Sequence, residues 1–303
     1  MKKCIVIGGT GFIGSALVSR LKNQNCEVVS VGSKDANLCN HGSLDKFDDD
    51  YDLIFHLAAW TQAGDFCVHH PGEQWLINQK INTNVLDWWH RKNRKTKLIA
   101  FGTSCVYDPK SQHKESEYLS GYPIEELFTY AMTKRMLYTG LKALNQQFGQ
   151  EYLLVVPSTV YGPNYFLKGK QLHFIFDLIR KILEFKHDQK PVVLWGDGFQ
   201  KRELIYIDDF IDDLLFISPL VNNDIVNIGA DKDYTIRQFA EVICENIGID
   251  KSLIKYNENA YVGARSKILN CEKLRNILPY WKRTELTYGI SQTINWMEKE
   301  LFE

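Results

Sequence analysis

The sequence has no long apolar run, no paired cysteines and no excess of charge of either sign. No hydrophobic stretch approaches the roughly 20 residues that an α-helix needs to cross a bilayer, so we expect a soluble protein without a membrane partner. The seven cysteines are scattered without CxxC pairs or clustered histidines. This spacing argues against a disulfide framework and a metal site, and it predicts a reducing, cytoplasmic location. The net charge of -1 and the lack of a basic stripe argue against a nucleic-acid partner.

The chain is long enough for a large folded unit. Its 303 residues, 45% of them hydrophobic and 24% charged, can form one large domain or two unequal lobes. We see no repeats or low-complexity tracts. The opening segment 1–9 has an apolar run of only about four residues that ends in glycines, which predicts a first strand rather than a signal peptide.

Strands and helices are expected to alternate along the first half of the chain. Buried-type apolar runs lie at 4–9, 26–32, 53–57, 98–101 and 152–156, and helical periodicity lies between them, notably at 15–21, up to Trp89 and at 130–148. This alternation predicts an α/β fold with a Rossmann-type, doubly wound parallel sheet. We assign the dinucleotide-binding domain to 1–162, rejoined by part of 204–240. Residues 163–303 should mainly form a smaller substrate-binding lobe at the carboxyl edge of the sheet, with helices near 178–185, 210–216, 236–247 and 286–299 and a strand at 192–195.

A glycine-rich segment, GGTGFIG, joins the first expected strand to the first expected helix. In this position Gly8 permits a tight turn, Gly11 lets the backbone approach a pyrophosphate, and Gly14 lets the helix pack closely on the strand. The helix N-terminus then faces the anion. The predicted contacts to a dinucleotide are Gly8, Thr10, Gly11, Phe12, Ile13 and Gly14.

The choice between NAD and NADP is made at the end of the second strand. An acidic residue there would bind the ribose diol and repel a 2'-phosphate, but the chain offers Ser33 and Lys34. A hydroxyl and an ammonium favour NADPH/NADP. Two alternatives remain: Lys34 can be an ordinary solvated loop charge, and Asp35 keeps NAD possible.

Tyr130 and Lys134 lie one helical turn apart and on one face of an expected helix. A nearby cation stabilises a phenolate, so we expect Lys134 to lower the pKa of Tyr130 from about 10 toward the working pH. The phenol could then exchange a proton with a carbonyl oxygen during hydride transfer. The pair becomes more specific because it follows a strand that ends at Thr103-Ser104-Cys105, whose hydroxyls should lie at the same edge of the sheet.

Together, these motifs resemble the extended short-chain dehydrogenase/reductase family. The resemblance is carried by GGTGFIG, by His56-Leu57-Ala58-Ala59, by Thr103-Ser104-Cys105-Val106-Tyr107 and by the YxxxK pair. Within the family the chain is most similar to the GDP-L-fucose synthases, which epimerise and then reduce GDP-4-keto-6-deoxymannose. The similarity runs nearly end to end, through 33–38, 82–85, 161–163, 195–198, 201–203 and 273–274.

The resemblance implies a role for each matching residue. Thr103 would supply the triad hydroxyl, Tyr130 the proton, and Lys134 the ribose contact that also polarises the tyrosine. Cys105 would be the epimerisation base and His173 its partner acid, acting on the acidic hydrogens beside a 4-ketone. Further cofactor contacts would be Asn37, Leu38, Leu57, Ala58, Ala59, Lys134 and Pro157, and the nucleotide-sugar would meet Ser104, Thr159, Trp195, Arg202 and Lys267. The resemblance also implies a homodimer through two helices, for which the candidates contain Trp88-Trp89 and 130–144, although those aromatics could equally be core.

The chain departs from the family near the expected sugar. The asparagine before the YGP turn is replaced at Thr159, and the two glycines after HLAA are replaced within 60–64. One alternative is therefore a reductase without epimerisation, acting on another GDP-, dTDP- or CDP-linked 4-keto sugar. A redox-neutral epimerase with bound NAD and a non-catalytic dinucleotide-binding module are further alternatives. Without the resemblance, Cys105 would be taken as a small buried hydrophobe and His173 as a surface residue.

Overall fold

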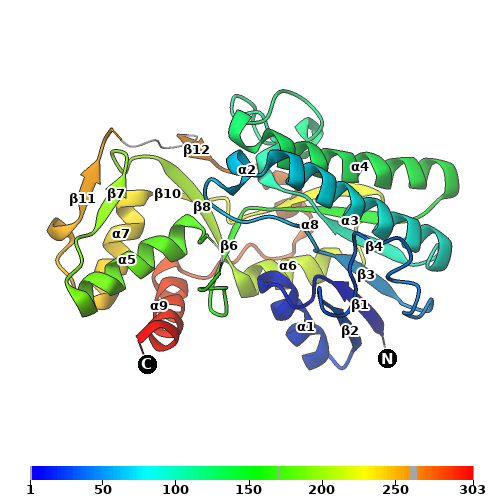
Figure 1. Cartoon of the computed structure of the whole chain (residues 1–303), viewed down its shortest axis with the longest axis horizontal. Coiled ribbons are helices and arrows are strands. Elements are labelled where there is room, and N and C mark those ends of the chain that lie inside the picture. Colours follow the sequence, from blue (N-terminus) through cyan, green and yellow to red (C-terminus); the bar gives the residue numbers. More distant parts are fainter. Residues whose placement is uncertain (1, 170, 260–264, 303) are drawn as a thin grey trace.

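A six-stranded parallel sheet forms the centre of the protein (Figure 1). The computed structural model describes residues 2–169, 171–259 and 265–302. The strand order is β2-β1-β3-β4-β5-β9, and each neighbouring pair is parallel. The strands are β1 (Lys3–Ile7), β2 (Glu27–Val31), β3 (Leu53–His56), β4 (Lys97–Phe101), β5 (Tyr152–Pro157) and β9 (Asp224–Ile228).

The order of the strands reverses at β1, which fixes where a ligand can bind. The chain places β2 on one side of β1 and then crosses to place β3 on the other side. In open α/β sheets, ligands bind beyond the carboxyl ends of the strands at such a switch point. The loops after β1, β3 and β4 all open at that edge, and they contain the glycine segment, the HLAA segment and Thr103.

Helices cover both faces of the sheet. On one face α1 (Phe12–Asn23) packs against α6 (Ile207–Ile217), and on the other α3 (Pro71–Lys92) packs along α4 (Phe128–Phe148) (Figure 1). The near-continuous apolar strands β1, β4 and β5 are buried along almost their whole length, as expected for a sheet covered on both sides. Trp88 and Trp89 of α3 are almost completely buried, so these aromatics belong to the core rather than to an exposed interface.

Most of the remaining elements form a second layer of structure beyond the carboxyl edge, at the left of Figure 1, whereas α8 packs on β9 and α2 packs on α3. One sheet pairs β10, β8 and β12, with β6 also on β8, and a two-stranded sheet pairs β7 with β11. The apolar faces of α5 and α7 pack together, and α9 packs on both. The bounds are α5 (Phe174–Asp188), α7 (Ile236–Ile247), α8 (Glu272–Ile277), α9 (Leu286–Phe302), β6 (Thr159–Tyr161), β7 (Val193–Trp195), β8 (Lys201–Tyr206), β10 (Asp233–Thr235), β11 (Lys255–Asn257) and β12 (Ser266–Lys267), with the short α2 (Phe66–His69) before α3.

The expected parallel, doubly wound sheet is confirmed, but the sequence did not reveal its last strand. β9 is five residues long and begins and nearly ends with polar residues, Asp224 and Asn227, so its periodicity is weak. The short strands β6, β10, β11 and β12 and the helix α8 were missed for the same reason. None of the described helices is both long and apolar enough to cross a bilayer.

Candidate active site

The glycine segment 8–14 forms a tight turn, here called the glycine cradle, in which larger side chains would collide with the neighbouring backbone. Gly8 has a φ of +93°, and a Cβ there would lie 2.7 Å from the backbone nitrogen of Ala58. A Cβ at Gly14 would lie 2.1 Å from the carbonyl oxygen of Gly8. Gly11 is the N-cap of α1 and offers no side-chain cap, so the first amides of the helix are open to an anion. The cradle therefore fits the pyrophosphate of a dinucleotide.

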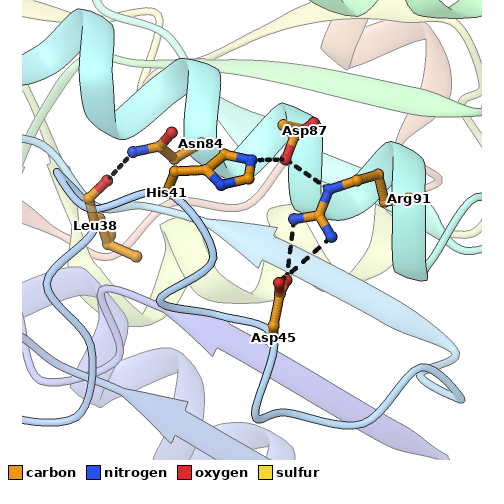
Figure 2. Close-up of polar contacts among 6 residues, drawn as sticks. All are labelled: Leu38, His41, Asp45, Asn84, Asp87 and Arg91. Carbon is orange, nitrogen blue, oxygen red and sulfur yellow. Dashed lines mark hydrogen bonds and ion pairs between the residues drawn. The ribbon is translucent and has the colours of Figure 1, made fainter.

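The segment that follows β2 is held in place by polar contacts with α3 (Figure 2). Asn84 donates to the Leu38 carbonyl at 2.8 Å, and Arg91 bridges Asp45 and Asp87 at 3.0 and 2.7 Å. His41 contacts the same Asp87 carboxylate at 3.1 Å. The position of Leu38 is thus fixed from a neighbouring helix, beside the exposed residue Asn37.

Ser33 and Lys34 are both exposed just after β2, where an adenine ribose would lie. The Asp35 carboxylate turns back and accepts the backbone N–H of Gly32 at 2.8 Å. The arrangement leaves a hydroxyl and an ammonium available at this corner, while the acidic group is used in the turn.

The HLAA segment passes directly beside the glycine cradle. The amides of Leu57 and Ala58 both donate to the Ile7 carbonyl, at 2.8 and 3.1 Å, and Ala59 follows them half-buried. Pro157 ends β5 at the same carboxyl edge of the sheet.

The predicted triad residues come together at the end of β4. Thr103 follows the strand and its hydroxyl accepts the backbone N–H of Cys105 at 3.3 Å. Lys134 is 3% exposed, donates to the Phe101 carbonyl at 2.8 Å, and lies 6.0 Å from the centroid of the Tyr130 ring. α4 begins at Phe128, so both helical residues lie in its first two turns and on one face.

The predicted direction of the pKa shift of Tyr130 is wrong. Burial, with smaller effects from Cys105 and Cys67, raises the pKa of the phenol instead of lowering it. The ammonium of Lys134 is itself destabilised, because burial lowers its pKa to about 8. The phenol is protonated at neutral pH, as an ordinary tyrosine is, and this is the form that can donate a proton to a carbonyl oxygen.

A lysine from the second layer reaches the same point. The Nζ of Lys267, on β12, lies 3.1 Å from the Sγ of Cys105. His173 is the N-cap of α5, and its ring centroid lies 6.0 Å from that of Tyr165, which packs at 5.1 Å against Phe12 of the glycine segment. The side chain of His173 is exposed to solvent. Desolvation by the neighbouring protein atoms, together with the charge of Lys267, lowers the pKa of His173 to about 4.

Arg202 and Lys267 stand side by side on paired strands. Arg202 of β8 is the register partner of Lys267 on one side and of Tyr234 of β10 on the other, so the three side chains share a face. Burial lowers the pKa of Arg202. Thr159 begins β6 and is also paired with β8. Adjacent guanidinium and ammonium groups can hold a pyrophosphate.

Two predicted substrate contacts are less closely tied to this cluster. Ser104 is half-buried in the short 3-10 helix Ser104–Val106. Trp195 is 63% exposed at the end of β7, in the separate two-stranded sheet. Of the sequence that flanks Lys267, Gly263 and Ala264 lie outside the described residues.

Sequence reasoning missed a buried polar stripe on α3. Gln74, Asn78 and Asn82 recur every four residues and are at most 4% exposed. Asn78 accepts the Trp60 N–H and donates to the Trp60 carbonyl, both at 2.9 Å, and Gln74 donates to the Thr61 hydroxyl at 3.2 Å. Gln74 and Asn78 therefore shape the segment 60–64, which is where the sequence departs from the family that it resembles. The four-residue spacing of three amides on an otherwise apolar face was the available signal.

The segment 60–64 also meets the residues just before His173. Gln171 donates to the Asp65 carboxylate at 2.6 Å, and its backbone N–H donates to the Gln62 side chain at 3.3 Å. Gly64 has a φ of +69°, and a Cβ there would lie 2.2 Å from the Gln171 side chain. Cys67, in α2, is 6% exposed and accepts from Gln74 at 3.4 Å. Within the described residues, no group of three or more His, Cys, Asp or Glu side chains could hold a metal ion.

Comparison with known proteins agrees with this geometry. Residues 4–229 match the NAD dependent epimerase/dehydratase family, and the chain belongs to that family. GDP-L-fucose synthase 1 of Arabidopsis thaliana is 27% identical over 307 residues, covering 99% of this chain and 94% of that protein.

Two solved structures share the fold over nearly the whole chain. A GDP-6-OMe-4-keto-L-xylo-heptose reductase from C. jejuni superimposes with a TM-score of 0.88 at 20% identity, over 99% of this chain and 98% of its own. A GDP-L-fucose synthetase from Naegleria fowleri bound to NADP has a TM-score of 0.85 at 22% identity, over 99% of this chain and 95% of its own. The family membership inferred from the motifs is confirmed.

Proposed function

We propose that the chain is an NADPH-dependent reductase of a nucleotide-linked 4-keto-6-deoxy sugar and that it also epimerises the carbons next to the ketone. The observation that carries the proposal is the meeting of two sets of groups at the end of β4. Thr103, Tyr130 and Lys134 gather there, and the Cys105–Lys267 contact lies beside them. The relatives named above are a GDP-L-fucose synthase, a GDP-L-fucose synthetase and a GDP-sugar reductase, which supports a GDP-linked substrate.

In this proposal residues 1–162, together with β9, hold the dinucleotide. The glycine cradle would receive the pyrophosphate, and Ser33 and Lys34 would receive a 2'-phosphate, since Asp35 is engaged by Gly32. Bound NADPH supplies the hydride. The second layer within 163–303 would hold the nucleotide-sugar, with Arg202 and Lys267 at its phosphates.

Tyr130 supplies the proton that balances the hydride. Its phenol is protonated at neutral pH and can donate to the oxygen that develops negative charge at C4. Burial raises its pKa further above the ordinary value. Thr103 would hold the same oxygen through its hydroxyl. Lys134, anchored on the Phe101 carbonyl, would position the cofactor ribose and stabilise the phenolate left behind.

In this proposal Cys105 and His173 would carry out the proton transfer at carbon. A 4-ketone acidifies the hydrogens at C3 and C5, and a thiolate on one face with an imidazolium on the other could invert either centre. Both residues lie around Lys267: Cys105 contacts its ammonium, and His173 lies within reach of its charge.

The second candidate function is reduction without epimerisation, and one observation favours it. The pKa of His173 is lowered to about 4 by burial and by Lys267, so the imidazole is neutral at pH 7 and is a poor proton donor. Inversion would then require substrate binding to restore a proton to His173.

One experiment separates these functions. Single-turnover NADPH oxidation is followed with GDP-4-keto-6-deoxymannose in deuterated water, and the product is analysed by NMR. Reduction with deuterium at C3 and C5 supports the epimerase-reductase. Reduction without deuterium supports the plain reductase. If no NADPH is oxidised with this substrate, the GDP-4-keto-6-deoxymannose assignment is wrong.

We also propose that the protein is a cytoplasmic homodimer through α3 and α4. The two helices border an apolar hollow, and Leu76 and Met136 are 59% and 46% exposed nearby. All seven cysteines are unpaired thiols, which supports a reducing compartment. Light scattering of the wild type and of Leu76→Glu tests the interface, because a monomeric wild type would refute it. The hollow is lined by Pro71, Gly72, Trp75, Phe128, Thr129 and Met132.

A further inference from the structure

The chain between β6 and α5 contacts two segments of the candidate dinucleotide site. We call residues 162–169 and 171–173 the strap. It leaves β6 through a turn in which Gly162 and Asn164 have φ values of +147° and +69°, and it ends at His173, the N-cap of α5. None of these described residues belongs to a helix or strand. The position of the strap therefore depends on its side-chain contacts with other segments.

The first contact joins the strap to the glycine cradle through three aromatic rings. Tyr165 lies edge-on to Phe12, with 5.1 Å between the ring centroids, and stacks on Phe176 of α5 at 4.0 Å and an angle of 8°. Phe12 and Phe176 also pack edge-on, at 6.0 Å. Phe12 is the first residue of α1, beside the amides that the cradle offers to a pyrophosphate. Aromatic pairs in these geometries stabilise a contact beyond the area that they bury, so the rings hold the strap against the cradle.

The second contact joins the strap to the segment that follows HLAA. The side-chain amide of Gln171 donates to the Asp65 carboxylate at 2.6 Å, and its backbone N–H donates to the Gln62 side chain at 3.3 Å. The side chain also lies over Gly64, where a Cβ would be 2.2 Å from the Gln171 Oε1. The segment that receives these contacts continues the HLAA stretch, which passes beside the glycine cradle. The strap is thus fastened at two separate places.

The two contacts are made at successive strand ends along the path that a dinucleotide would follow. Phe12 comes after β1 and Gln62 after β3, and the next strand in the sheet is β4, where the predicted triad residues gather. A dinucleotide with its pyrophosphate at the cradle and its nicotinamide ribose at Lys134 has to pass both strand ends. The strap follows this path, so a dinucleotide would lie between the strap and the edge of the sheet.

We propose that the strap retains the bound dinucleotide and that Tyr165 and Gln171 are the residues that fasten it. Both contacts join protein groups to protein groups, so they form whether or not the site is filled. The strap must then open to admit NADPH and open again to release NADP, and its opening sets both rates. This inference concerns the cofactor and applies whichever sugar is reduced, so it goes beyond the proposed function.

The test measures how fast NADPH binds and leaves, without any sugar. Stopped-flow fluorescence follows NADPH binding to the full chain, and a chase with excess NADP gives the dissociation rate. We expect Tyr165→Ala to raise both rates by about tenfold or more, because loss of the stacked ring favours the open strap. The dissociation constant should change by less than about threefold, since it is the ratio of two rates that rise together. Tyr165→Phe keeps the ring and should behave as the wild type does.

A second variant and a matched control accompany Tyr165→Ala. Gln171→Ala removes an exposed side chain at the other end of the strap, so it should fold normally. It should raise both rates by about threefold, the effect of one hydrogen bond. Phe302→Ala removes a similar ring stack at the far end of α5, where Phe302 lies on His187 with centroids 4.2 Å apart and planes at 11°. This control should bind and release NADPH at the wild-type rates.

Three results would overturn the proposal. The first is a rise in the dissociation rate alone, because that change indicates a direct contact with the dinucleotide instead of a strap. The second is wild-type rates in both Tyr165→Ala and Gln171→Ala, and the third is an equal acceleration in Phe302→Ala. If circular dichroism shows that Tyr165→Ala is unfolded, Gln171→Ala decides the question. Because the assay contains no sugar, a failed reductase assay leaves its result intact, and unchanged NADPH rates leave the reductase function intact.

Discussion

The buried ammonium of Lys134 should set the alkaline limit of the reaction. Lys134 is 3% exposed and burial lowers its pKa to about 8, so it loses its charge only slightly above neutral pH. Tyr130 adds no limit below pH 10, because burial raises its pKa above the usual value of 10. If charged Lys134 is required, kcat/KM for NADPH should be level up to about pH 8 and then fall about tenfold for each further pH unit.

The assay is initial-rate NADPH oxidation across the pH range, since kcat/KM reports the groups of the free enzyme. Lys134→Arg keeps the charge to very high pH, so its profile should stay level where the wild type declines, even if its absolute rate is lower. Lys97 is a second buried lysine whose pKa is lowered to about 8, at the other end of β4, where it donates to the Val221 carbonyl at 2.5 Å. Circular dichroism at high pH therefore has to show that the fold survives. A wild-type profile that is level well above pH 8 would refute the argument.

Three further predictions follow from contacts at and near the site. Tyr130→Phe should lower kcat by about 10²- to 10⁴-fold with NADPH affinity unchanged, as measured by steady-state kinetics and cofactor fluorescence. Gly14→Ala should abolish NADPH binding in a fluorescence titration, because its Cβ would lie 2.1 Å from the Gly8 carbonyl, whereas Gly72→Ala meets nothing within 4 Å and should bind normally. Glu203, 2% exposed, has its pKa raised from 4.5 to about 7 by burial. Its folded state binds the proton more tightly, so the free energy of unfolding should fall by about 3 kcal/mol as pH rises through that window, a slope absent in urea melts of Glu203→Gln.

Short-range signals made the cofactor half of the site predictable. The glycine segment and the Tyr130–Lys134 pair are each recognisable within seven residues of sequence. The parallel sheet then brings both to the same carboxyl edge. The buried strands β1, β4 and β5 were equally clear, because strands covered on both faces must be apolar along their length. β9 escaped notice because a five-residue strand with polar residues at or near both ends has no distinctive periodicity.

The candidate substrate half of the site depends on contacts between residues far apart in the sequence, which no local pattern predicts. Lys267 meets Cys105 across 162 residues, through a two-residue strand whose place is fixed only by its pairing with β8. The resemblance suggested an acid at His173, but whether that imidazole is charged depends on the protein atoms around it and on Lys267. Under the proposed function, the charge of the His173 imidazole separates an epimerase from a plain reductase, so the decision between the two must be measured at that side chain.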